Sequence, residues 1–193
     1  KDQGTSVGAV ASVSDGATGV GKDNNGDKAF MGKLYATPVA PLYLSGTFYD
    51  SGDLGTGKSE MSIAALNSVS TNATEWAREA WELNARVDLW KGKKPFNPIA
   101  YNDSKVILRG AYGEFADDVT GADDRDGAFS FADVMVNVCA KFYVAARYSV
   151  VELDDDATAK LNSVTANMYE RYSVGAGYRW SDNTIIKLGY DWN

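Results

Sequence analysis

The stretch RYSVGAGYRW, residues 171–180, decides the fold, because its side chains change character at every step. One side carries mostly large apolar or aromatic side chains, at Tyr172, Val174, Ala176, Tyr178 and Trp180. The residues between them are Arg, Ser or Gly, and the alternation resumes after a polar turn, in TIIKLGYDW at 184–192. A two-residue period is that of a β-strand, whereas a helix would scatter these rings around its axis. The two segments therefore predict an antiparallel hairpin.

The same alternation upstream predicts seven further strands. They are expected at about 7–13, 30–37, 42–49, 81–89, 106–113, 128–138 and 141–151. Short connections are expected at 38–41, 139–140 and 181–183, with a medium-length one at 91–103. The remaining connections are long, polar and rich in Asp, Asn, Gly and Ser, at about 14–27, 51–79, 116–126 and 153–167. This arrangement places every short connection at one edge of a single domain, residues 1–193.

Composition excludes several classes of protein. The chain has 26 acidic and 19 basic residues, a formal charge of −7, no His and one Cys. These numbers argue against a nucleic-acid partner, a Ser-His-Asp or Cys-His catalytic site, an internal disulfide and a four-cysteine zinc site. Nothing singles out a positioned acid–base pair, so we expect no enzymatic activity and no cofactor.

An all-β fold remains, and it is predicted to be an antiparallel transmembrane β-barrel with an up-and-down meander. Barrel strands cross a bilayer with about 9–11 alternating residues, and their connections are short at one end and long at the other. Nine strands is an odd number, whereas single-chain bacterial barrels have even numbers. The chain is therefore expected to be an incomplete part of a larger barrel. The alternative is a soluble or secreted β-barrel or sandwich that binds a ligand.

Residues 171–180 and 184–190 resemble the carboxyl-terminal hairpins of bacterial outer-membrane porins. The first fits the porin pattern aromatic-x-x-Gly-x-Gly-Tyr-Arg, the second resembles Thr-hydrophobic-Lys-Leu-x-Tyr with two hydrophobic residues in place of one, and 141–149 looks like another such strand. Porins end on an aromatic residue, whereas this chain ends at Asn193, which agrees with an incomplete barrel. The resemblance implies passive diffusion of small hydrophilic solutes, contact with outer-membrane lipid, a homotrimer and no cofactor.

The side chains opposite the apolar stripes are the candidates for lining the pore. They comprise eight bases and four acids: Lys33, Arg86, Arg109, Lys141, Arg147, Arg171, Arg179, Lys187, Glu82, Asp88, Asp133 and Asp191. This excess of bases predicts a preference for anions in a water-filled pore. An equally good interpretation is that the charges pair across strands and only make the wall hydrophilic, without selecting ions. The loop 51–79 is long enough to fold inwards and narrow the pore.

Two further patterns have competing interpretations. Residues 52–59, GDLGTGKS, match the phosphate-binding loop G-x-x-x-x-G-K-[ST], but the preceding strand alternates and no βαβ rhythm follows. We therefore expect the match to be accidental. Asp123, Asp124 and Asp126 are weak candidates for calcium, yet they lack the full twelve-residue loop with its terminal Glu. Solvated loop charge is the preferred interpretation, so no metal site is predicted.

Overall fold

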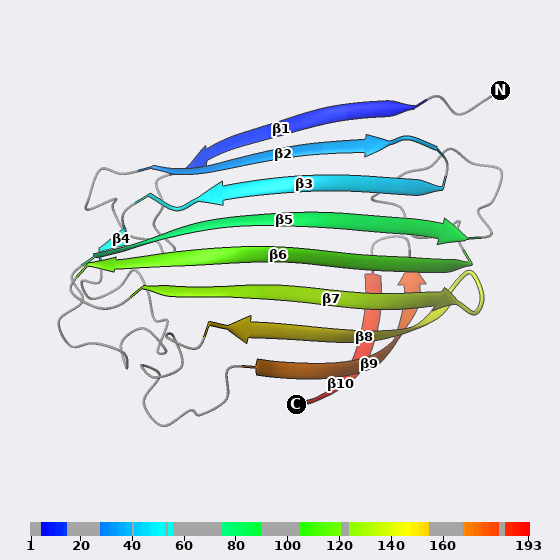
Figure 1. Ribbon diagram of the computed structural model, residues 1–193. Coiled ribbons are helices and arrows are strands. Elements are labelled where there is room, and N and C mark those ends of the chain that lie inside the picture. Colours follow the sequence, from blue (N-terminus) through cyan, green and yellow to red (C-terminus); the bar gives the residue numbers. More distant parts are fainter. Residues whose placement is uncertain are drawn as a thin grey trace.

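The computed structural model describes residues 5–14, 28–39, 41–52, 54–55, 75–89, 105–120, 124–154, 168–181 and 184–193. These residues form one antiparallel sheet (Figure 1). Its strands are β1 (Ser6–Ser14), β2 (Ala29–Thr37), β3 (Leu42–Asp50), β4 (Leu54–Gly55), β5 (Glu75–Leu89), β6 (Val106–Thr120), β7 (Arg125–Asn137), β8 (Phe142–Leu153), β9 (Met168–Ser181) and β10 (Thr184–Trp192). The described part of the chain contains no helix that is long and apolar enough to cross a lipid bilayer.

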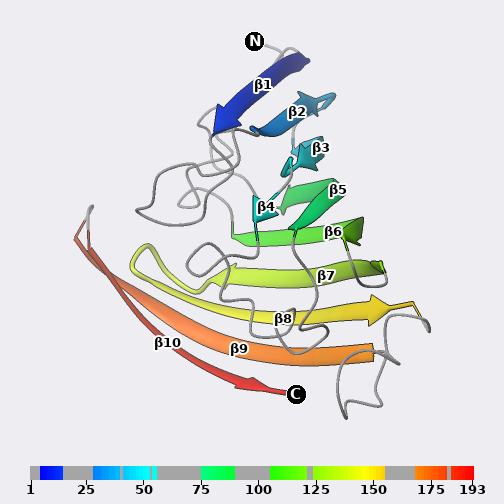
Figure 2. The ribbon, with the colours of Figure 1, turned by 90° about the vertical axis from the view of Figure 1, so that its left-hand side faces the viewer.

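The sheet is an up-and-down meander, as the alternation predicted. Nine strands follow one another in the order β1-β2-β3-β5-β6-β7-β8-β9-β10, and the two-residue β4 pairs beside them with β5. Within the described ranges β1 pairs only with β2 and β10 only with β9, so the sheet is not closed. Figure 2 shows that it is strongly curved, with β1 and β10 at opposite ends of the arc. The all-β antiparallel meander is therefore confirmed, and an open curved sheet is consistent with part of a barrel.

Some strands extend further than their side-chain pattern indicated. β5 begins at Glu75, β6 continues to Thr120, and β7 begins at Arg125, within segments that were expected to be loops. The backbone ladder between β5 and β6 is unbroken to the pair of Glu75 with Thr120. The alternation fades here because both faces carry polar side chains, as at Arg78 and Glu79. Backbone pairing does not need an apolar side, so it continues where the sequence signal ends.

One face of the sheet, which we call the apolar face, is covered by aliphatic and aromatic side chains. Strand register keeps these side chains on one face of the sheet from β1 to β10. Examples from successive strands are Val7, Leu34, Leu44, Leu83, Leu108, Val134, Val144, Val174 and Leu188. Many are open to solvent: Leu188 is 80% exposed, Leu34 67% and Leu83 58%. No second described layer packs against this face.

The opposite face, which we call the polar face, holds most of the buried side chains. Ile107, Ala111 and Leu153 are buried there, together with charged residues that include Arg86 and Asp133. Side chains crowd together on the concave side of a curved sheet, and the burial therefore identifies the polar face as the concave one. Compared with a water-soluble sheet, the distribution is inverted, since the apolar residues are exposed and the charged ones are buried.

Glycines let aromatic rings lie flat on the polar face. Gly177 faces Tyr143 in the register of β8 and β9, and a methyl group at Gly177 would overlap the Tyr143 ring. The same relation holds for Gly8 with Tyr35 on β1 and β2. Two more direct cross-strand pairs repeat it, Gly113 with Phe129 and Gly127 with Phe115. An aromatic ring that covers a glycine shields the bare backbone and fixes the register of its strand pair.

Candidate functional site

A row of polar side chains crosses the polar face at the level where β5 to β10 are all paired. Strand register aligns Arg86, Arg109, Asp133, Arg147, Ser173 and Asp191 in this order, one from each strand. Each lies between two apolar-face residues of its own strand, so period-two alternation turns it to the polar face. The row therefore brings together residues that are up to 105 positions apart in the chain.

Asp133 lies at the centre of this row and is shared by two arginines. Arg109 binds it through two parallel hydrogen bonds of 2.8 Å from Nε and Nη2, and Arg147 donates to Oδ2 from Nη2 at 2.7 Å. The Asp133 side chain is only 4% exposed, whereas those of Arg109 and Arg147 are 34% and 43% exposed. One carboxylate against two guanidinium groups leaves one net positive charge, which faces the solvent on the concave side.

Two further arginines form complete pairs. Arg86 binds Asp88, two positions along the same strand, with Nε–Oδ1 and Nη2–Oδ2 distances of 2.7 and 2.8 Å, and both residues are buried. Arg78 binds Asp117 across β5 and β6 at 2.6 and 2.9 Å. Bidentate pairs of this kind fix the side chains and cancel their charge. The alternative reading, that charges on the wall pair with one another, therefore describes Arg86 and Asp88 well.

Arg179 is held by neutral groups. Its guanidinium donates to Asn137 Oδ1 at 2.9 Å and to the Ala140 carbonyl at 3.4 Å. The group also stacks on Tyr143, 4.9 Å from the ring centre. Arg147 stacks in a similar way on Phe131, at 4.4 Å. The flat aromatic rings of the polar face thus carry and orient the guanidinium groups.

Asp133 with its two arginines, and Arg179 with Tyr143, line a cavity of about 690 Å³ on the concave side of β6 to β10. Its floor is partly bare backbone, at Gly175 and Gly189, which pair with each other. Its charged lining consists of four bases and two acids, Arg109, Arg147, Arg179, Lys187, Asp133 and Asp191. A cavity with an excess of two positive charges favours anionic over cationic solutes.

The other predicted lining residues lie away from this cavity. Lys33 and Glu82 share a second row on the polar face through Thr47. Arg171 lies on β9 and donates to Asn193 Oδ1 at 2.9 Å, while Lys141 lies in the turn before β8. The prediction omitted side chains that orient arginines, namely Asn137, Phe131 and Tyr143. Tyr143 faces Gly177 across β8 and β9, whereas Phe131 faces Ala111 and Ser149, so no glycine marks the second ring.

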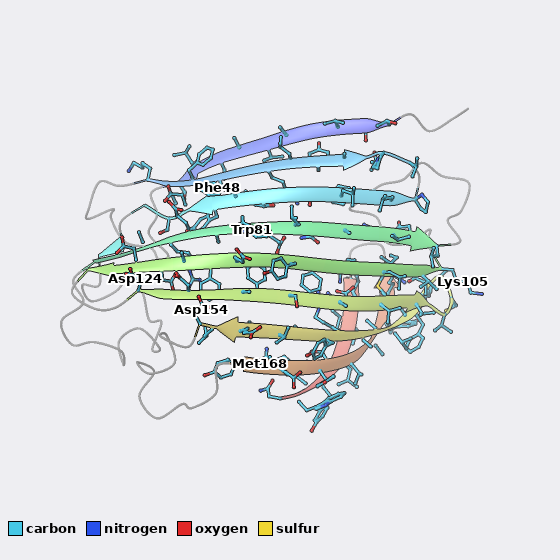
Figure 3. The ribbon with its side chains drawn as sticks, in the orientation of Figure 1. Phe48, Trp81, Lys105, Asp124, Asp154 and Met168 are labelled. Carbon is cyan, nitrogen blue, oxygen red and sulfur yellow. The ribbon has the colours of Figure 1, made fainter. Side chains whose placement is uncertain are left out.

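The aromatic side chains of the apolar face gather towards its borders. Tyr112 and Tyr148 donate from their hydroxyl groups to Glu114 and Glu170, at the edge that faces the long connections. Three rings form a continuous ladder across β8, β9 and β10, with centroid distances of 4.9 Å for Tyr148–Tyr172 and 5.7 Å for Tyr172–Trp192. Figure 3 places Asp124 and Asp154 at the long-connection end of the strands and Lys105 at the other end.

The acidic segment that was considered for calcium lies partly outside the described residues, because Asp123 is not among them. Where the chain is described, no group of three His, Cys, Asp or Glu side chains is placed to hold a metal ion. Asp126 lies beyond the apolar border, where burial and the negative charges of Asp154, Asp124 and Asp117 raise its pKa. These carboxylates therefore repel one another across the end of the sheet.

The start of the glycine-rich motif 52–59 is also described. Gly52 has a φ of 60°, a left-handed conformation that glycine accommodates easily. Its amide donates to Asp50 Oδ1 at 2.8 Å, which closes a tight turn after β3. The chain then pairs with the start of β5 through Leu54 and Gly55. Lys58 and Ser59 lie outside the described residues, so the expectation of an accidental match stays a prediction.

Comparison of the chain with protein-family models, with curated proteins and with solved structures finds no match. The function must therefore be inferred from the sheet and its two faces.

Proposed function

We propose that this chain forms the wall of an outer-membrane porin, through which small hydrophilic solutes and ions diffuse passively. The observation that carries the proposal is the inverted distribution of side chains. A single curved sheet exposes an almost unbroken apolar face and collects its charged and buried groups on the concave side. Lipid is the solvent that stabilises such an apolar face, and water is the solvent that stabilises the charged one.

The dimensions of the apolar face support this proposal. On β9 it extends from Tyr172 to Trp180, and eight residue steps at roughly 3.3 Å give about 26 Å along the strand. The apolar band of outer-membrane barrels is about 25 Å tall and is bordered by aromatic side chains. Tyr112 and Tyr148 fit such a border, since their rings lie on the apolar face and their hydroxyl groups reach Glu114 and Glu170.

The charges of the concave side support a pore that prefers anions. The complete pair of Arg86 with Asp88 contributes no net charge, whereas Asp133 neutralises only one of its two arginines. With Arg179 and Lys187 added, the cavity keeps a positive excess. Outer-membrane localisation and a homotrimeric assembly follow from the resemblance to porins and belong to the same proposal.

The test is reconstitution of the purified full chain. We expect extraction from membranes only with detergent, and stepwise conductance when the protein is added to a planar bilayer. In a gradient of KCl, the sign of the reversal potential should indicate a modest preference for chloride. A protein that stays soluble and monomeric without detergent and gives no conductance steps would contradict the proposal. That outcome would favour the ligand-binding β-barrel or sandwich.

A further inference from the structure

The geometry points to a specific oxyanion-binding site in the cavity of β6 to β10, centred on Arg179 and Lys187. Its ligand class is a compact anion with two negative charges, for which inorganic phosphate is the probe. The site deepens the proposed function, and its role in solute passage rests on that function. Binding itself does not require a conducting pore.

Arg179 is the best-prepared cation of the cavity. Its guanidinium donates hydrogen bonds to the amide oxygen of Asn137 and to the Ala140 carbonyl, and neither acceptor carries a charge. Tyr143 supports the plane of the guanidinium from one side. An arginine that is oriented by neutral acceptors and an aromatic ring keeps its full charge and loses little conformational freedom when it binds an anion.

Lys187 lies close to Arg179 in the register of the last hairpin. It pairs with Gly177 on β9, and Arg179 lies two positions further along that strand, on the same face. The lysine is exposed and lines the same cavity as Arg179. Gly177 has no side chain and the Tyr143 ring lies flat over it, so a ring, and no projecting side chain of β9, lies between the two cations.

The other two cations of the cavity are already engaged. Arg109 and Arg147 both bind Asp133, so that together with it they contribute one positive charge. Asp191 contributes a negative charge to the lining, and the sum over the cavity is two positive charges. A doubly charged oxyanion matches this excess better than a singly charged one does, because the Coulomb attraction grows with the charge of the ligand. Arginine also binds two oxygens of such a group at once.

The experiment measures binding of radiolabelled inorganic phosphate to the detergent-solubilised full chain by equilibrium dialysis at low ionic strength. Sulfate should compete, and nitrate, which is compact but singly charged, should compete at least several-fold less well. Arg179→Gln should weaken phosphate binding roughly tenfold or more, which is the effect of losing a charge-assisted hydrogen bond. Lys187→Gln should weaken it as well, while Arg179→Lys should retain part of the affinity.

Lys105→Gln is the matched control. It removes one positive charge at the same end of the sheet, from an exposed residue that does not line the cavity, and it should leave binding unchanged. Circular dichroism identifies variants that have lost the β-sheet, and Lys187→Gln, an exposed position, supplies the decisive result if Arg179→Gln unfolds. Absence of phosphate binding, or equal binding by wild type and both Gln variants, would overturn the site. Conductance steps without phosphate binding would support the pore and overturn the binding site. Phosphate binding without conductance would support the binding site and contradict the pore.

Discussion

Asp133 determines how much of the positive charge on the polar face is available to a solute. Its carboxylate is almost fully buried, and the two arginines that bind it remain partly exposed. The arrangement is therefore asymmetric, since the negative charge is shielded by protein while the positive charges face the solvent. At the level of single residues, selectivity depends on which charges are exposed as well as on how many there are.

We predict that the double substitution Arg109→Glu, Arg147→Glu shifts the reversal potential in a KCl gradient towards cation selectivity. The change removes two bases and leaves three uncompensated carboxylates around one point of the wall, counting Asp133. Lys105→Glu, at an exposed residue directly before β6, is the control and should have a much smaller effect. An unchanged reversal potential in the double variant would show that the two arginines do not line the conducting path.

The pair of Gly177 with Tyr143 leads to a stability prediction. Gly177→Ala places a methyl group where the Tyr143 ring lies, and overpacking of this kind costs about 1–3 kcal/mol of unfolding free energy. Gly189→Ala is the matched control, because a methyl group there meets its nearest neighbour, the Val174 carbonyl, at an ordinary 3.6 Å. Urea unfolding in detergent micelles measures both. Equal stability of the two variants would argue against the packing described for Tyr143.

At the scale of the strand, neighbouring residues lie on faces of opposite character. Val174 on β9 belongs to the apolar face and lies between Ala146 and Tyr190, while Ser173 lies on the polar face between Arg147 and Asp191. In the proposed pore wall, the strand would separate lipid from water over a single residue step. Substitution of the same residue type at these two positions tests the assignment of the faces directly.

Val174→Arg should destabilise the folded protein in lipid vesicles by about 2–4 kcal/mol, the cost of an arginine at the middle of the lipid-facing band. Ser173→Arg should cost much less, since its side chain would reach water and lie near Asp191. Unfolding of vesicle-embedded protein in guanidinium chloride gives both values. A larger loss for Ser173→Arg than for Val174→Arg would reverse the assignment of the two faces.

The alternation of side chains is sufficient to predict the nine strands and their faces, because an apolar side chain at every second residue is typical of a strand with one apolar side. The ends of β5 and β6 nearest the long connections could not be predicted from the side-chain pattern, since both faces carry polar residues there. Nor could the partners of Asp133. A shift of two residues between strands keeps every side chain on its face, so alternation leaves the register open. The shared carboxylate emerges only when Arg109 and Arg147 are placed opposite it.

For the molecule as a whole, the net charge and the charge of the cavity lining have opposite signs. The chain carries a formal charge of −7, whereas the cavity lining has an excess of two positive charges. Acidic residues gather instead beyond the apolar border, as at Glu114, Asp126 and Asp154. The total charge of the protein is therefore a poor guide to the field that a solute meets inside.

We predict that the preference for chloride weakens as salt rises from about 0.1 M to about 1 M KCl. The Debye length falls from about 10 Å to about 3 Å over this range, which screens wall charges from ions that pass at a distance. Reversal potentials at a fixed concentration ratio and increasing absolute concentration measure the effect. A preference that does not change with salt would point to direct contact at a narrow constriction in place of the general field of the wall.

The rings that lie flat over glycines have a consequence for the bore of the proposed channel. The rings of Tyr143, Phe129, Phe115 and Tyr35 lie flat on the wall and reach across to the facing glycine of the neighbouring strand. The free diameter is then governed by the backbone and changes little when these side chains fluctuate. A permeating molecule would pass flat aromatic rings that do not project into the lumen, and the charged residues at a few fixed positions would determine its selectivity.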